Sequence, residues 1–146
     1  MSDHGTGVIE FELMGTTKKA ERVLADYGSD GRSAARTSLW IDYPYIVCYA
    51  LFYALACGTL AQRAQRLGRE TWAAVGVALA WGGLLAGFLD AIENAALLWV
   101  LDGHPEQPFP AIAFLCAVPK FALSAAVILY LLAGLVLLRG APRREV

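Results

Sequence analysis

The sequence is short of charge and lacks the motifs by which many soluble functions are recognised. Charged residues make up 17% and hydrophobic residues 58% of its 146 residues, against about 25% and roughly 45–50% in soluble domains. It contains no basic patch interleaved with aromatic residues, so nucleic acid is not expected as a partner. It also contains no phosphate loop, nucleophile–base pair or His-rich ligand set, so we predict no catalytic residue, no metal site and no cofactor.

Cysteine and targeting signals are equally sparse. The three cysteines Cys48, Cys57 and Cys116 lie inside apolar runs without metal-type spacing, which predicts reduced, buried packing residues. Residues 1–7 are polar and have no signal-peptide apolar core. The first apolar helix is therefore expected to act as the targeting signal.

What the chain does have is three long apolar runs, predicted as helices over about residues 39–62, 71–101 and 111–138. About 20 residues suffice to cross the hydrocarbon core, so the fold class predicted is an all-α integral membrane protein with three long transmembrane helices in a lipid bilayer. We divide the chain into a polar and amphipathic segment (1–37), a three-helix transmembrane bundle (38–140) and a basic tail (141–146). Pro44 is expected in a first helical turn, and Pro119 should kink the third helix.

Two short elements are predicted ahead of the spans. Residues 8–14 alternate in polarity, as a half-buried strand does, although the chain offers no second strand to pair with it. Thr16 or Thr17 can cap a short amphipathic helix that Gly28 ends. Its apolar face would either lie on the membrane surface or pack on the end of the bundle; this face comprises Ala20, Val23, Leu24 and Tyr27.

Polar residues inside the apolar runs form the candidate site. Antiparallel neighbours bring residues equidistant from a turn to the same depth, and this places five residues in one layer. We call them the polar cluster: Asp42, Asp90, Glu93, Asn94 and Lys120. Charged groups at membrane depth are costly and face a partner or a cavity, so the cluster is expected in the interior.

Helical faces agree with this layer. Gly83, Gly87, Asp90 and Asn94 follow a spacing of four, three and four, and the two glycines form a GxxxG pattern that allows close helix packing. Two more inward faces are predicted, on the first helix with Asp42, Tyr45, Tyr49, Tyr53 and Ala56, and on the third with Ala113, Cys116, Ala117, Lys120, Ser124 and Gly134. The bulky Leu97, Leu98, Ile128 and Leu129 are expected on the remaining surface of the helices, outside these inward faces.

Four short motifs resemble a family of small bacterial inner-membrane proteins without an assigned activity. They are residues 21–24 (ERVL), residues 27–28 with 31–32 (YG and GR), residues 38–43 (SLWIDY) and residues 89–94 (LDAIEN). The resemblance covers about residues 20–102 and pairs an aspartate opening the first span with Asp-x-x-Glu-Asn in the second. It implies a shared architecture and a multi-pass location in the bacterial inner membrane, and it implies no chemistry.

Arginine placement predicts the orientation. The first connection and the C-terminal tail carry Arg, whereas residues 102–110 carry neither Lys nor Arg, so the first connection and the C-terminus are expected in the cytoplasm. Three spans then put the N-terminus outside. The basic residues of the N-terminal segment oppose this orientation; they are Lys18, Lys19, Arg22, Arg32 and Arg36.

Three functions are open at this point. The first is a non-catalytic structural or interaction subunit, with a membrane-complex partner or a second copy of the chain, in which the cluster fixes helix register. The second is a proton or cation path through an oligomer, because three carboxyl groups outnumber one lysine. The third is a carboxylate- or metal-dependent membrane enzyme using Asp42, Asp90 and Glu93. His104 lies nearby in a Pro-rich loop, where a solvated histidine is the ordinary expectation.

Overall fold

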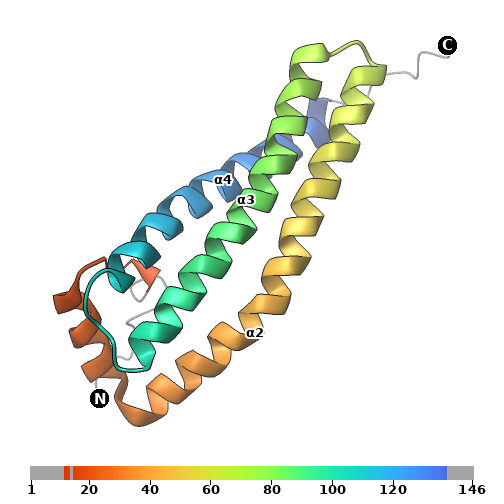
Figure 1. Cartoon of the computed structure of the whole chain (residues 1–146). Helices are drawn as coiled ribbons and strands as arrows, with labels where there is room; N and C mark the ends of the chain where they lie inside the picture. The colour runs from red at the N-terminus through yellow and green to blue at the C-terminus, as the bar shows by residue number, and fades with distance from the viewer. Residues whose placement is uncertain (1–11, 14, 138–146) are drawn as a thin grey trace. The chain divides into compact units, whose positions relative to one another are not determined.

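Three long helices make up the described chain. The computed structural model describes residues 12, 13 and 15–137, and it contains α2 (Thr17–Arg66), α3 (Glu70–Leu101) and α4 (Phe109–Leu137), with no strand among these residues (Figure 1). All three are long and apolar enough to cross a membrane. The predicted bounds of α3 and α4 are confirmed to within two residues, and the strand predicted at residues 8–14 falls outside the described residues apart from Glu12 and Leu13.

Gly28 divides α2 into two parts, as the sequence predicts. Its φ of 59° and ψ of −166° are not helical, and a positive φ suits the glycine that follows a helix end. Arg32 contacts the helix end at this break, because its Nε and Nη2 donate to the Leu24 oxygen at 3.0 and 2.9 Å. Figure 1 shows the short first part turning into the long second part of α2.

The second part of α2 corrects one prediction. The helix continues without interruption through Pro44, which was expected in a first turn. Proline has no N–H to donate to the carbonyl four residues earlier, which is that of Trp40. The residues on both sides of Pro44 are nevertheless helical. The helix ends at Arg66, one turn beyond the predicted end at residue 62.

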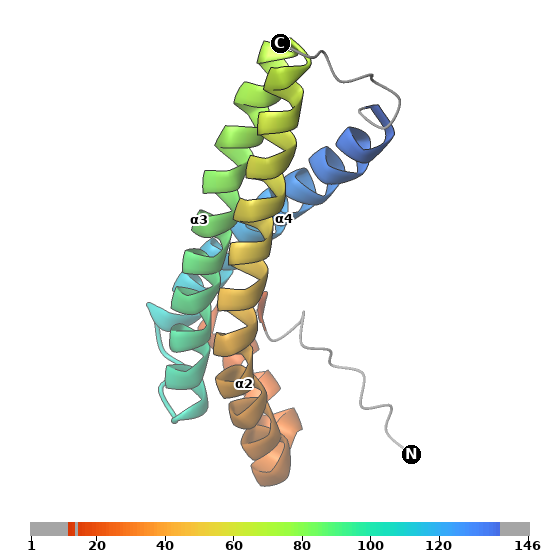
Figure 2. The ribbon, with the colours of Figure 1, turned by 90° about the vertical axis from the view of Figure 1, so that its right-hand side faces the viewer.

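The chain packs as two compact units. One consists of the described residues of Met1–Ile46 and Phe88–Pro119, and the other of those of Val47–Gly87 and Lys120–Val146. In the second unit, the end of α2 and the start of α3 lie side by side, joined by a tight connection (Figures 1 and 2). Gly68 has a φ of 70° in that connection, and Arg69 donates its N–H to the Ala64 carbonyl at 3.0 Å.

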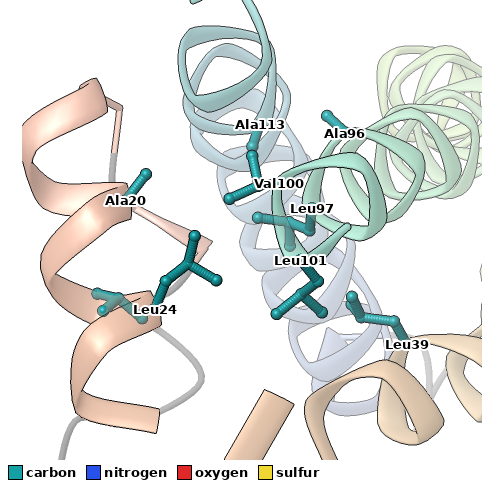
Figure 3. Packing of buried hydrophobic residues seen from close by; sticks show 9 residues of the cluster. Ala20, Leu24, Leu39, Ala96, Leu97, Val100, Leu101 and Ala113 are labelled. Carbon is teal, nitrogen blue, oxygen red and sulfur yellow. The ribbon is translucent and has the colours of Figure 1, made fainter. Parts of the chain in front are cut away.

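The short first part of α2 packs inside the first unit. Ala20, Val23 and Leu24 are buried, and Figure 3 shows Ala20 and Leu24 facing the α3 residues Val100 and Leu101. Of the two placements predicted for this amphipathic face, the structure therefore shows the packed one. The same cluster contains Leu97, which is fully buried, so its predicted place on the outer surface is wrong.

Candidate functional site

The polar stripe predicted on α3 is buried along its length. Gly83, Gly87, Asp90 and Asn94 all lie inside, together with Glu93. The opposite faces of α3 carry exposed Trp81, Leu84, Leu85 and Phe88. Polar groups inside and bulky apolar groups outside are the distribution expected of a helix surrounded by lipid.

One contact in this cluster joins α2 to α3. The Asn94 amide Nδ2 donates a hydrogen bond to Asp42 Oδ2 at 2.8 Å. Asn94 is 1% exposed and Asp42 is partly buried. Burying an amide without a partner is costly, and a bond to a carboxylate is about twice as strong as one between neutral groups. The pair therefore fixes the alignment of the two helices at this level.

A neighbouring tyrosine supports the same alignment. The Tyr43 hydroxyl donates to the Ala91 carbonyl at 3.4 Å, close to the upper limit for a hydrogen bond. The Tyr43 ring also lies against Trp40, with centroids 5.6 Å apart. Asp42 and Tyr43 thus both contact α3: Asp42 bonds to the Asn94 side chain, and Tyr43 bonds to the Ala91 backbone carbonyl.

Asp90 and Glu93 complete the acidic part of the cluster in this unit. Both lie on the buried face of α3, and Glu93 is fully buried. Residues three apart on a helix are neighbours, so two carboxyl groups share one short stretch of this face. Removing a carboxylate from water is unfavourable unless pairing and hydrogen bonds offset the cost. The desolvation cost of the cluster's acids is therefore largest in this stretch of α3.

Lys120, the fifth member of the cluster, belongs to the second unit and is the first residue of its second segment. It is 6% exposed, and its Nζ lies 4.7 Å from the centroid of the Phe121 ring. The buried position agrees with the inward face predicted for α4, where Ala113, Cys116, Ala117 and Gly134 are also buried. Its proximity to the acids stays a prediction.

The inward face predicted for α2 is rotated from the observed one. Tyr45 was expected inside and is 63% exposed. The buried positions are Leu39, Ile46, Ala50, Cys57, Ala61 and Ala64. Tyr49, Tyr53 and Ala56 lie at the border of this face and are partly buried.

The described residues contain no group of three or more His, Cys, Asp or Glu side chains that could hold a metal ion, so Asp42, Asp90 and Glu93 do not form one. His104 is exposed in the second connection, where its Nδ1 lies 3.3 Å from Glu106 Oε1 and its ring stacks on Trp99.

The cysteines are free; Cys57 and Cys116 are buried as predicted, whereas Cys48 is exposed, contrary to the prediction.

Several contacts were not predicted. Arg36 of α2 forms an ion pair with Asp102 at the end of α3. Tyr130 of α4 stacks on Trp72 and donates to the Trp72 carbonyl at 3.2 Å. Arg36 lies shortly before the first predicted span and Asp102 directly follows the second, so their opposite charges could have indicated the first contact. Neither spacing nor polarity indicates the second contact.

The site therefore offers alignment of two helices through Asp42 and Asn94, with two further buried acids beside them. Comparisons with protein-family models, curated proteins and solved structures gave no match. The function is accordingly argued from geometry.

Proposed function

We propose that this chain is a multi-pass protein of the bacterial inner membrane that serves as a non-catalytic structural or interaction subunit. The observation that carries the proposal is the distribution of side chains on α3, where Asp90, Glu93 and Asn94 are buried while Trp81 and Phe88 are more than half exposed. In water that arrangement would leave large apolar groups solvated and bury the acids. In lipid both placements are favourable. The motif resemblance supports the bacterial inner membrane.

The cluster acts as a fastener in this proposal. Asn94 and Asp42 come from different helices of one unit, and their bond fixes which residues of α2 and α3 face each other. Buried polar pairs specify register in some helical assemblies while adding little net stability. With the cluster facing inward, the outer apolar face remains available to lipid or to a protein partner.

The outer face gives the test. A photo-crosslinking amino acid at Trp81, which is 70% exposed, should yield protein adducts in native membranes, whereas the same group at the fully buried Ala86 should yield none. The chain should also stay with the membrane after alkaline carbonate extraction. Only lipid adducts from position 81 would argue against an interaction subunit, and release by carbonate would argue against membrane insertion.

A second function is favoured by the acid count. Asp90 and Glu93 are both buried on one face of α3, and acids at membrane depth commonly mark proton or cation paths. Three spans would need several copies to form such a path. Under this alternative, Asp90→Asn abolishes ion-dependent flux in vesicles, while Asp102→Asn, at the exposed end of α3, leaves it intact. Flux equal in both variants would defeat the alternative.

A further inference from the structure

A groove in the second unit has chemistry that the polar cluster does not explain. It lies between α2 and α4 and has a volume of about 440 Å³, within the range of about 300–1,000 Å³ typical of small-molecule sites. Phe52, Ala56 and Leu60 line it from α2, and Leu131 and Leu135 from α4.

The groove is elongated. Its α2 residues lie at positions 52, 56, 60 and 63, which follow one face of the helix for about 16 Å at 1.5 Å per residue. Thr59 also lines it, but the Thr59 hydroxyl donates to the Ala56 carbonyl at 2.9 Å within its own helix. The α2 wall of the groove is therefore apolar until Arg63. A long apolar groove matches an extended hydrocarbon chain better than a compact ligand.

Close packing of α2 on α4 bounds the groove. A Cβ atom added at Gly134 would lie 2.2 Å from Leu60 Cδ2, so Leu60 occupies the space that glycine leaves. Gly134 is buried, and Leu60 both contacts it and lines the groove.

The charge at one end identifies the head of the occupant. Arg63 lines the groove in the last turn of α2, where Arg66 is the other basic residue, and Arg69 follows in the connection. No acidic residue occurs between positions 43 and 69. A guanidinium recognises phosphate through paired hydrogen bonds, and basic residues next to a membrane span attract anionic lipids.

We propose that this groove holds one acyl chain of an anionic phospholipid whose phosphate pairs with Arg63. The inference rests on the membrane location proposed above. Phe52, Ala56, Leu60, Leu131 and Leu135 contact the chain, and the headgroup lies at the arginine-rich end of α2. The groove is thus a lipid-binding site that is selective for the charge of the headgroup.

Native mass spectrometry of the full chain in mild detergent tests the headgroup. Phosphatidylglycerol should be retained about fivefold more than phosphatidylcholine with the same acyl chains, as expected for one basic residue near an anionic lipid. Arg63→Gln should remove this preference. Arg66→Gln is the matched control, since Arg66 lies in the same turn and does not line the groove, and it should keep the preference.

A second pair of variants tests the groove itself. Ala56→Phe should fill it and lower retention of both lipids, whereas Ala78→Phe, at an exposed site on α3, should not. Circular dichroism of each variant confirms that the helices are intact. Equal retention of the two lipids by the native chain, equal effects of the two arginine changes, or equal effects of the two alanine changes would overturn the inference. A chain that is soluble without detergent would instead overturn the membrane proposal.

Discussion

The contact between Asn94 and Asp42 gives the polar cluster a residue-scale role that can be measured. Asn94 is almost fully buried, so its amide depends on protein partners for its hydrogen bonds. Its bond to Asp42 joins two helices and uses a carboxylate as the acceptor. Truncating either residue leaves the other without this partner. The cost should therefore exceed that of losing an exposed hydrogen bond.

We expect Asn94→Ala and Asp42→Ala each to lower the free energy of unfolding in detergent, and the double variant to lower it by less than their sum. The coupling energy should be about 0.6 kcal/mol, the average for hydrogen bonds between membrane helices. Chemical unfolding followed by circular dichroism measures it. Asn94→Ala combined with Asp102→Ala is the control cycle, because Asp102 pairs with Arg36. A coupling no larger than in the control would show that the Asp42 bond does not fix register.

At the scale of elements, Gly83 shows how α3 approaches α2 closely within one unit. A Cβ atom at Gly83 would lie 2.6 Å from Tyr53 Cβ, closer than side chains tolerate. At the adjacent Gly82 the nearest atom is Leu123 Cδ2 at 3.4 Å, an ordinary contact. The first glycine of the GxxxG pattern is therefore used inside the chain, where Tyr53 packs on it.

Gly83→Ala should destabilise the protein by about 1–3 kcal/mol, because the added methyl group forces the two helices apart. Gly82→Ala should be neutral or slightly stabilising, since alanine is the better helix former by about 1 kcal/mol. Thermal unfolding of both variants in the same detergent compares them directly. Equal melting temperatures would mean that Tyr53 moves aside at little cost and that the close approach is not required.

The helices were easier to predict than their rotation. Long apolar runs and Gly28 were enough to place α3, α4 and the break in α2, because length and a glycine at a helix end are local signals. The inward face predicted for α2 was wrong because it was defined by Asp42 and extended along the helix through Tyr45. A tyrosine is polar at one end and apolar along its ring, so it suits lipid interfaces as well as interiors.

At the scale of the whole molecule, the sequence predicted the burial of Asp90, Glu93, Asn94 and Lys120 correctly, because a charged or amide group in an apolar helix has few favourable places outside. It also predicted Asp42 opposite α3. It missed Arg36 with Asp102 and Tyr130 with Trp72, which depend on tertiary geometry. Residue spacing along one helix says nothing about which side chain of another helix arrives there.

The orientation of the whole chain in the membrane is predicted from the distribution of its basic residues. Arg63, Arg66 and Arg69 lie around the first connection, and the N-terminal segment carries Lys and Arg ahead of the first span. Arg36 pairs there with Asp102, and Gln107 donates to the Gly15 carbonyl at 3.4 Å, so this segment and the second connection share one end. The positive-inside rule counts both ends, and the first connection together with the C-terminal tail carries one more basic residue than the N-terminal segment.

We expect a cysteine at Gln65 to face the cytoplasm and one at His104 to face the opposite side, in a chain with Cys48, Cys57 and Cys116 replaced by alanine. Both positions are exposed, Gln65 in the last turn of α2 and His104 in the second connection. In intact cells, a membrane-impermeant maleimide should label position 104 and not position 65, and permeabilised cells should label both. Labelling of position 65 alone would reverse the orientation, and the Lys and Arg residues of the N-terminal segment would then be the ones that set it. Labelling of both positions in intact cells would place the two connections on one side, which three membrane-crossing helices do not allow.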